Sequence, residues 1–479
     1  QQPLVRIGCS TRRRLRKNQL QGGINSLHLK IYDSRTPRGF GSSLFLHLTQ
    51  IRSTSMLTIQ SLREEKDRIL AALDKRHFDA REAIQQVLEW DAERRKTQAK
   101  LDDTLAQSNA LSREIGGLMR EGKKEEAEAV KAQTSSLKAQ SSELKEQMQA
   151  LETQIHDALC HIPNAPHADV AAGRNAEDNV ETFRSGDAST LEHHKKPHWD
   201  IAEQCQLIDF ELGAKVTGAG FPFYRGKGAK LQRGLIRFFL EQADAAGDEE
   251  FIPPHMINPD SGFGTGQLPD KEGQMYHMQD DELYMIPTAE VPLTNIYRDV
   301  MVMEGDLPIK LCGYTPCFRR EAGSYGKDVR GLNRLHQFDK VEIVQFAHPE
   351  ESYATLDGMV EHVKGLLEAL ELPYRILRLC GGDMGFTSAM TYDFEVWSAA
   401  QERWLEVSSV SNFETYQANR LKCRYKGNDG KTHLVHTLNG SALALPRIVA
   451  ALLENHQDDT GIRIPAALVP YCGFERIDF

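Results

Sequence analysis

The feature that most restricts the fold is a long helical pattern in the N-terminal third of the chain. Residues 80–120 contain no proline, and apolar side chains recur along them at helical spacing. After a turn at 121–124 (EGKK), a second run keeps apolar residues seven, four and three positions apart. The pattern predicts an antiparallel coiled-coil hairpin, with arms of about forty residues and roughly 60 Å. The predicted seam comprises Ile84, Val87, Leu101, Leu105, Ile115, Met119, Val130, Leu137, Leu144, Met148, Leu151 and Ile155.

The charges on this hairpin do not identify its partner. Basic clusters at 94–96 and 123–124 could contact phosphates, but three glutamates between 125 and 128 stand beside the second cluster. Polar residues such as Gln98 and Ser108 also interrupt the seam. Taken alone, the residues favour a dimerisation coiled coil or a spacer, and charge does not indicate RNA binding.

Two strand-like runs at 309–321 and 336–346 flank a glycine-rich, charged loop. Side chains alternate between the two faces of a strand, so antiparallel pairing of the runs would present one wall of four residues. This wall comprises Arg319, Glu321, Phe338 and Glu342. Each residue alone is typical of a core aromatic or a surface ion pair. Together they offer a guanidinium for phosphate, a ring for a base and carboxylates for an amine or hydroxyl, which predicts a nucleotide site with a small polar co-substrate.

Two further segments carry groups that suit such a site. Thr288, Ala289 and Glu290 end the strand-like run LYMIPTAE, where a hydroxyl and a backbone carbonyl can receive an ammonium group. An ordinary strand end explains this segment equally well. Glu406 and Ser409 lie in RWLEVSS and are hard oxygen ligands of the kind that magnesium prefers.

Two other segments predict local structure near the site. The run 434–447 (LVHTLNGSALALPR) predicts a strand, a glycine turn and a helix that begins near Leu443, because Pro446 is tolerated only in a first turn. Upstream, an amphipathic helix at 231–246 is followed by a short predicted strand at 251–254 that ends in two prolines.

Several of these segments resemble one known family. The string FRREAGSYGKDVRGLNRLHQFDKVE at 318–342 resembles motif 2 of class II aminoacyl-tRNA synthetases, in the form found in bacterial-type seryl-tRNA synthetases. The run 434–447 resembles motif 3, and the segment 231–254 resembles motif 1, the dimer-interface element. The resemblance covers about 56–479. It implies an α+β fold, in which a class II antiparallel β-sheet domain with flanking helices follows an N-terminal coiled-coil arm.

The same resemblance implies a reaction and a set of site residues. The reaction is ATP-dependent activation of L-serine to seryl-adenylate, followed by transfer to the 3′ end of tRNA(Ser), and of tRNA(Sec) where present. The implied catalytic residues are Arg319, Arg447 and Glu406. The implied ATP-binding residues are Arg319, Arg320, Glu321, Arg334, Phe338, Glu406, Val407, Ser408, Ser409 and Arg447. The implied serine-binding residues are Thr288, Ala289, Glu290, Arg319, Glu342, Asn439 and Ser441.

Cofactor and partners follow from the resemblance as well. Glu406 and Ser409 would hold Mg²⁺ against the ATP phosphates. The arm would grip tRNA(Ser), the chain would form a homodimer, and its place would be the cytoplasm without membrane association. The eight cysteines include no C-x-x-C pair, so we expect no structural zinc.

Composition limits the remaining possibilities. The net charge of −10 argues against indiscriminate nucleic-acid binding, and no apolar run is long enough to cross a bilayer. No P-loop pattern occurs, and GFGTGQLP at 262–269 lacks the strand and helix of a dinucleotide-binding fingerprint. Residues 1–55 carry ten Lys or Arg and one acidic residue. They suit a transit peptide, a basic arm or upstream sequence, and we prefer the last, with disorder and no catalytic role.

We therefore expect four parts: an extension at 1–55, an N-terminal tRNA-binding domain at 56–165, a linker at 166–195 and a catalytic domain at 196–479. Three other classes stay open at this point. They are a class II synthetase for another amino acid, a synthetase-like ligase that charges a carrier protein, and a non-catalytic RNA-binding or coiled-coil interaction protein.

Overall fold

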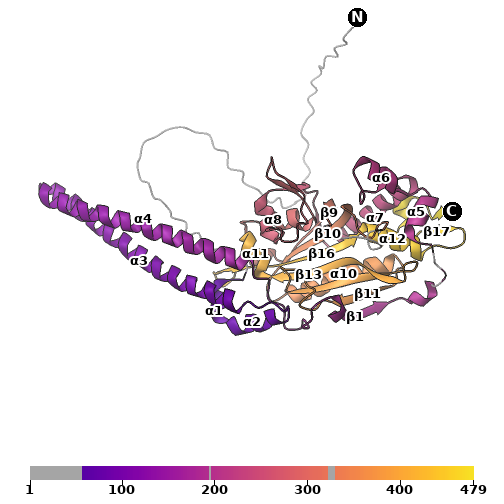
Figure 1. Ribbon diagram of the computed structural model, residues 1–479, viewed down its shortest axis with the longest axis horizontal. Helices are drawn as coiled ribbons and strands as arrows, with labels where there is room; N and C mark the ends of the chain where they lie inside the picture. The colour runs from indigo at the N-terminus through magenta and orange to yellow at the C-terminus, as the bar shows by residue number, and fades with distance from the viewer. Residues whose placement is uncertain (1–56, 192, 194–195, 322–329) are drawn as a thin grey trace, which may run out of the picture. The chain divides into compact units, whose positions relative to one another are not determined.

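The computed structural model describes residues 57–191, 193, 196–321 and 330–479. The chain divides into two units, Gln1–Ile51 and Arg52–Phe479, and the described helices and strands all belong to the second unit (Figure 1). The basic extension predicted at 1–55 therefore lies outside the described residues. Among the helices that are described, none is both long and apolar enough to span a membrane.

The N-terminal part of the second unit is helical. Two short helices, α1 (Ile59–Glu64) and α2 (Lys66–Asp74), precede the long helices α3 (Arg81–Arg120) and α4 (Lys124–Cys160). The long helices lie side by side and are joined by a tight turn, in which Gly122 has a φ of +79° that favours glycine (Figure 1). The predicted antiparallel hairpin is confirmed.

The seam of the hairpin differs along its length. Near the base, Ile84, Val87 and Ile155 are completely buried, as predicted. Farther out, many buried positions carry short side chains, and the predicted seam residue Met119 is 56% exposed. The buried residues of this outer part are Thr97, Leu101, Thr104, Ala127, Thr134, Ser141, Leu144 and Met148.

Two of the buried threonines fit the seam because their hydroxyl groups are satisfied within their own helices. Thr104 donates to the carbonyl of Lys100 at 2.8 Å, and Thr134 donates to the carbonyl of Val130 at 3.0 Å. Each threonine can therefore turn its methyl group into the seam without leaving a polar atom unpaired. The two helices of the outer hairpin consequently make a sparse apolar contact that contains few large side chains.

An eight-stranded sheet forms the centre of the following region, in the order β1-β11-β12-β13-β16-β10-β9-β4. Neighbouring strands are antiparallel except for the edge pair β4 and β9, which is parallel. The strands are β1 (Val180–Ser185), β4 (Glu249–Glu250), β9 (Ile309–Phe318), β10 (Gln337–Ala347), β11 (Tyr374–Arg378), β12 (Met390–Ser398), β13 (Arg403–Glu414) and β16 (His436–Ala444). Strand β1 lies inside the segment predicted as a linker, 166–195, and pairs with β11.

Among the helices that pack on this sheet, three contribute to its large apolar core: α7 (Gly226–Ala245), α10 (Ser352–Ala369) and α12 (Leu445–Asn455). Strand β10 shows how one sequence serves two environments. Its residues Val341 and Ile343 belong to the large apolar core, together with residues of these helices. The alternate residues of β10 point to the other face, where the candidate site lies.

Smaller elements complete the fold. The helices are α5 (His198–Gln204), α6 (Phe210–Val216), α8 (Pro259–Thr265), α9 (Glu290–Asn295), α11 (Thr415–Leu421) and α13 (Val469–Cys472). The strands are β2 (Ile208–Asp209), β3 (Phe223–Tyr224), β5 (Met256–Ile257), β6 (His277–Met278), β7 (Leu283–Met285), β8 (Met301–Met303), β14 (Arg424–Lys426), β15 (Thr432–Leu434), β17 (Gly461–Arg463) and β18 (Arg476–Asp478). Short 3-10 turns lie at Ala176–Asp178, Ala188–Leu191 and Glu304–Asp306.

Two local structures predicted for segments of or next to the large sheet are wrong. The strand expected at 251–254 is absent: β4 ends at Glu250, and only Phe251 continues toward β9, donating to the carbonyl of Cys312 at 2.8 Å. Pro253 and Pro254 have no N–H to donate, so the ladder cannot extend through them.

The glycine turn expected within 434–447 is also wrong, because β16 runs straight through Gly440 to Ala444 and α12 begins only at Leu445. A side chain at Gly440 would come within 3.2 Å of Val410 and 3.3 Å of Met359 on α10. The glycine therefore serves close packing between β16, β13 and α10 rather than a turn.

Candidate active site

One cavity of about 620 Å³ opens on the face of the sheet away from the apolar core. Side chains from β10, β13 and β16 form its floor, and the loops at 266–275, 287–290, 332–335 and 385–387 contribute its walls. A volume of this size suits a nucleotide-sized ligand. The cavity is therefore the place at which the predicted site residues can be compared with the structure.

The wall predicted from the two strand-like runs exists. Strands β9 and β10 pair in the antiparallel sense with Phe338 opposite Cys317, which places Arg319 on the same face as Phe338. The Arg319 guanidinium lies 5.2 Å from the centre of the Phe338 ring and its Nε donates to the carbonyl of Pro287 at 3.3 Å. Glu321 and Glu342 line the same cavity.

Glu342 is the centre of a buried polar group. Its carboxylate receives Asn439 Nδ2 at 2.8 Å and the Thr288 hydroxyl at 3.3 Å, and Lys340 Nζ lies 2.6 Å from its Oε2. Glu342 itself is completely buried, and Lys340 is nearly so. This pairing satisfies the carboxylate charge in a place where an unpaired charge would be costly. Ser441, opposite Glu342 in the β10–β16 ladder, also lines the cavity.

A second buried carboxylate, Glu290, lies beside this group. Burial, together with the nearby charge of Glu342, raises the pKa of Glu290 to about 7. Gln417 donates to Glu290 Oε1 at 2.7 Å, and Gln417 in turn accepts the Thr437 hydroxyl at 2.8 Å. Glu290 begins helix α9, whereas the sequence placed it at a strand end; the preceding strand β7 already stops at Met285.

Arginine side chains gather at the other end of the cavity. Arg447, in the first turn of α12, donates from Nε to the carbonyl of Asn333 at 3.0 Å and from Nη1 to the carbonyl of Glu406 at 2.6 Å. Its Nη1 is also 3.7 Å from Glu406 Oε2. Arg334 Nη1 donates to Glu321 Oε2 at 2.8 Å. Two guanidinium groups thus face one space that an anionic ligand can enter.

A β-bulge brings Glu406 and Ser409 to the same cavity. Residues three apart on a regular strand point to opposite faces, but the ladder between β12 and β13 shifts register between Phe394–Ser408 and Glu395–Glu406. Glu406 and Ser409 therefore both line the cavity. Asp393 on β12 is opposite Ser409 in the ladder, and burial together with the charge of Glu406 raises the pKa of Asp393 well above its usual range. Its Oδ1 is buried and has no hydrogen-bond partner among the described residues.

These oxygen atoms bear on the predicted magnesium site. Glu406 and Ser409 supply two hard donors next to the arginine-rich end of the cavity, and Asp393, whose Oδ1 is unsatisfied, is the neighbour of Ser409 on β12. The donor set fits a cation that takes its other ligands from phosphate and water. Within the described ranges no three His, Cys, Asp or Glu side chains form a cluster suited to a metal held by protein alone.

Most predicted site residues line this single cavity. They are Thr288, Glu290, Arg319, Glu321, Arg334, Phe338, Glu342, Glu406, Val407, Ser408, Ser409, Asn439, Ser441 and Arg447. Two do not: Ala289 is fully buried, and Arg320, which follows the end of β9 at Phe318, is absent from the lining of the cavity. The loop segment 322–329 of the motif 2 string lies outside the described residues.

The cavity also contains residues that the sequence analysis did not select. Lys340 lies on the same face of β10 as Phe338 and Glu342, so strand alternation already carried the signal for it. Lys271, Gln274, Phe386 and Arg420 come from loops and from α11, where no spacing pattern points to a shared site.

Comparisons with known proteins agree with this geometry. Residues 56–166 match the family described as seryl-tRNA synthetase N-terminal domain, and residues 275–456 match the tRNA synthetase class II core domain (G, H, P, S and T). The serine–tRNA ligase of Salinibacter ruber is 51% identical over 424 residues, which cover 88% of this chain and 99% of that protein. The serine–tRNA ligase of Alkaliphilus oremlandii is 45% identical, with coverage of 87% and 98%.

Solved structures give the same result. The seryl-tRNA synthetase from Pyrococcus horikoshii, complexed with ATP, superposes with a TM-score of 0.81 at 33% identity, covering 88% of this chain and 99% of that one. The antiparallel sheet with its motif segments around one cavity defines a class II aminoacyl-tRNA synthetase. Within that class, the chain belongs to the seryl-tRNA synthetase family.

Proposed function

We propose how the cavity performs the reaction of this family. The chain activates serine with ATP and then transfers it to tRNA. In the first step a serine carboxylate oxygen attacks the α-phosphorus of ATP, giving seryl-adenylate and pyrophosphate. In the second step a hydroxyl of the terminal adenosine attacks the activated carbonyl and releases AMP. The observation that carries the proposal is the single cavity shared by Arg319, Phe338, Glu342 and Arg447.

The ATP subsite is assigned to the open end of the cavity. Phe338 stacks the adenine, which takes the place of the Arg319 contact on one ring face, and Glu321 accepts from the adenine amino group. Arg319 then neutralises charge on the α-phosphate, while Arg334 and Arg447 hold the outer phosphates. Catalysis consists mainly of alignment and charge neutralisation, and no general base is needed.

The serine subsite is assigned to the buried polar group around Glu342. Glu342, Asn439, Thr288 and Ser441 surround a small space in which the serine hydroxyl can donate to the Glu342 carboxylate. Alanine has no hydroxyl group and would forgo this charge-assisted hydrogen bond while still occupying the buried polar space, so it is rejected strongly. Glu290 and the peptide at Thr288 receive the ammonium group.

Magnesium is assigned to Glu406 and Ser409. The carboxylate of Glu406 and the hydroxyl of Ser409 would hold the ion, which would supply positive charge for the ATP phosphates. Glu406 also orients Arg447 through its backbone carbonyl, so the same residue supports two sources of positive charge at one end of the cavity. No zinc takes part in this proposal.

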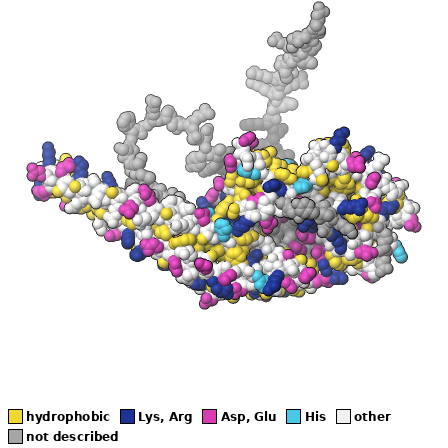
Figure 2. Space-filling view, in the orientation of Figure 1, with side chains coloured by type: hydrophobic (Ala, Val, Ile, Leu, Met, Phe, Trp, Pro, Cys, Tyr) yellow, Lys and Arg dark blue, Asp and Glu magenta, His cyan; other side chains and the backbone are white. Residues whose placement is uncertain are grey.

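The hairpin α3–α4 is assigned to tRNA binding. Lys and Arg are interspersed with Asp and Glu along it (Figure 2), so it presents small basic patches rather than one continuous basic surface. That arrangement suits a protein that selects one RNA shape and avoids others. Its length is the other support, since α3 has 40 residues and extends about 60 Å.

Dimerisation is assigned to the region that resembles motif 1. Ile252 is 88% exposed and Met256 is 49% exposed, so a second copy of the chain would find apolar side chains to cover. We expect sedimentation equilibrium to show a homodimer and Ile252→Glu to shift it toward monomer. A monomeric wild-type chain would remove this assignment.

The remaining assignments concern boundaries and location. We propose an extension at 1–55, a tRNA-binding domain at 56–165, a connecting segment at 166–195 that lends β1 to the catalytic sheet, and a catalytic domain at 196–479. Since ATP, serine and tRNA meet in the cytoplasm, we place the chain there. Limited proteolysis tests the boundaries, and cell fractionation tests the location.

Serine-dependent exchange of labelled pyrophosphate into ATP tests the proposed function most simply. The experiment presents each of the twenty amino acids to the purified chain with ATP and Mg²⁺. We expect rapid exchange with serine alone, followed by serine transfer to tRNA(Ser) in a second assay. Exchange with a different amino acid would assign the chain to another specificity, and absence of exchange with all twenty would overturn the proposal.

A further inference from the structure

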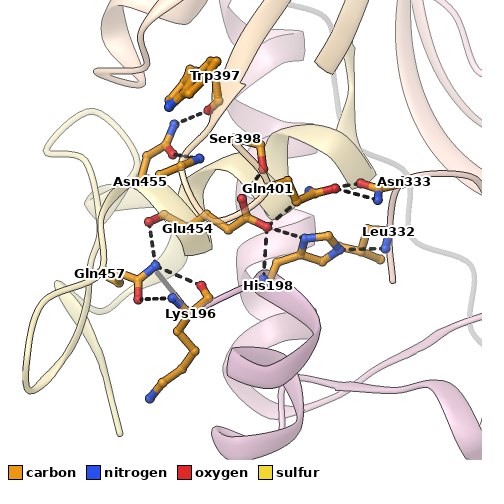
Figure 3. A network of polar contacts seen from close by, with 11 residues as sticks. Lys196, His198, Leu332, Asn333, Trp397, Ser398, Gln401, Glu454, Asn455 and Gln457 are labelled. Atoms are coloured by element: carbon orange, nitrogen blue, oxygen red, sulfur yellow. Dashed lines mark hydrogen bonds and ion pairs between the residues drawn. The ribbon is translucent and has the colours of Figure 1, made fainter. Parts of the chain in front are cut away.

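A buried polar network lies behind the arginine-rich end of the cavity (Figure 3). His198 opens helix α5, Glu454 lies near the end of α12, and both are completely buried. Glu454 Oε1 accepts from the backbone N–H of His198 at 3.1 Å and lies 2.7 Å from His198 Nδ1. Ser398 donates its hydroxyl to the other oxygen, Glu454 Oε2. Neither His198 nor Glu454 lines the cavity itself, so neither acts on substrate directly.

The hydrogen bonds determine the proton position on His198. Its Nε2 lies 2.9 Å from the backbone nitrogen of Leu332, and because a peptide N–H can only donate, Nε2 is the acceptor. The proton is therefore on Nδ1 and is donated to Glu454. Burial alone would raise the pKa of Glu454, but hydrogen bonds from His198 and Ser398 outweigh this effect and lower it. A neutral imidazole thus bridges an ionised carboxylate and the peptide at 332.

This peptide belongs to the segment that holds Arg447. Leu332 and Asn333 both line the cavity, and the Asn333 carbonyl accepts from Arg447 Nε at 3.0 Å. Gln401 joins the same segment to the network, since it accepts from Asn333 Nδ2 at 2.9 Å and donates to Glu454 Oε1 at 3.3 Å. Figure 3 shows His198 and Gln401 as two parallel links from Glu454 to residues 332 and 333.

Two further observations show that the network and the segment 331–333 pack tightly against each other. Arg447 and Glu454 are seven residues apart on α12, which places them on one helix face two turns apart. At one end of that face Arg447 bonds to the Asn333 carbonyl. At the other end Glu454 reaches residues 332 and 333 through His198 and Gln401. Gly331 has a φ of +66°, and a Cβ there would come within 2.3 Å of His198 Nε2. Only glycine allows both the turn and the close approach of the imidazole.

We propose that His198 is a positioning residue for ATP. The pair of Glu454 and His198, with Gln401 beside it, fixes the peptide at 332–333, whose carbonyl directs the Arg447 guanidinium at the triphosphate. The inference rests on the proposed function, because it takes Arg447 to be a phosphate ligand. It adds three residues outside the cavity that determine affinity for ATP and leave the serine subsite untouched.

Steady-state pyrophosphate exchange separates this role from a purely structural one. We expect His198→Ala to raise KM for ATP about tenfold, the size of one lost hydrogen bond to a charged group, with KM for serine within about twofold of wild type. His198→Gln carries a donor and an acceptor on one planar group, so it should restore part of the ATP affinity. An equal rise in both KM values, or a lower melting temperature without any change in KM for ATP, would overturn the proposal.

The matched control is His456→Ala. His456 is a buried histidine near the end of the same helix, and its Nε2 contacts the carbonyl of Leu370 at 3.0 Å, away from the cavity. We expect this variant to lower the melting temperature with KM for ATP unchanged; a rise matching that of His198→Ala would overturn the proposal.

If His198→Ala does not fold, Gln401→Ala takes its place, since Gln401 is only partly buried and its loss breaks one link. The expected rise in KM for ATP is then about threefold, and an unchanged value would overturn the proposal. A wild-type chain without serine-dependent exchange would instead remove the proposed function itself, so the two failures can be told apart.

Discussion

The outer hairpin and the catalytic sheet are stabilised in different ways. The outer hairpin buries short or polar side chains such as Thr97, Thr134 and Ser141 between two helices. The sheet buries large aromatic side chains, including Tyr374 and Phe394, in one continuous core. The hairpin therefore provides length with little packing, whereas the sheet provides a rigid support on which buried charges can be held in place.

The ion pairs of the two regions differ in the same way. Lys131 and Glu128 on the hairpin are both more than 60% exposed, and such a pair contributes little to stability. Lys340 and Glu342 in the cavity are nearly or completely buried, so loss of either partner leaves an uncompensated charge. Substitutions in the sheet should consequently affect the chemical reaction. Substitutions in the hairpin should affect RNA binding or local order.

The largest expected effect is that of Arg319→Ala. Because the guanidinium is held in the cavity before ATP binds, its loss should reduce serine-dependent exchange about 100- to 1,000-fold. Affinity for tRNA, measured by filter binding, should stay within about twofold of wild type. The control is Arg184→Ala, which removes a half-exposed arginine on the edge strand β1. Weakened tRNA binding with intact exchange would show that the two regions are not separate in function.

A pair of large-to-small substitutions measures the packing difference. Phe394→Ala removes a fully buried ring of the sheet core and should lower the free energy of unfolding by about 3–5 kcal/mol. Leu101→Ala on the hairpin should cost only about 2 kcal/mol, the low end of the range for such a change, because water can fill the space beside a two-helix seam. Urea titrations followed by circular dichroism compare the two variants. Equal costs would mean that the hairpin is packed as firmly as the sheet.

A smaller effect should appear in the pH dependence of stability. The pKa of Glu290 is raised to about 7 from an ordinary value of 4.5, so folding takes up a proton between these values. The stability contributed by the protonated group is complete below about pH 4.5 and is lost as the pH rises through 7. Glu290→Gln should therefore gain about 1–3 kcal/mol relative to wild type at pH 8 and almost nothing at pH 4. A constant difference across this range would refute the assignment.

Much of the fold and of the site can be predicted from the sequence. Strand alternation is enough to place Arg319, Phe338 and Glu342 on one face, and helical spacing is enough to place the hairpin and its turn. The fold class, the family and the reaction follow from the motif segments. These predictions succeed because periodicity and local motifs are properties of short segments.

Other features of the structure depend on contacts or hydrogen bonds that residue spacing does not reveal. Gly440 is typical of a turn residue, yet close packing against Met359 on α10 keeps it inside a strand. The bulge near Val407 that brings Glu406 and Ser409 to one face depends on pairing with β12. Thr104 and Thr134 take the place of larger residues in the seam because their hydroxyl groups bond within their own helices. None of these effects can be read from spacing alone.

The division of work between the two regions is tested most directly by removing the outer hairpin. Residues 99–146 lie symmetrically about the turn at Gly122, so a short glycine linker can join position 98 to position 147. Exchange and tRNA charging are then measured on one preparation. The account predicts serine-dependent exchange within about twofold of the intact chain and a loss of at least about 100-fold in kcat/KM for tRNA. Loss of exchange, or full retention of tRNA charging, would contradict it.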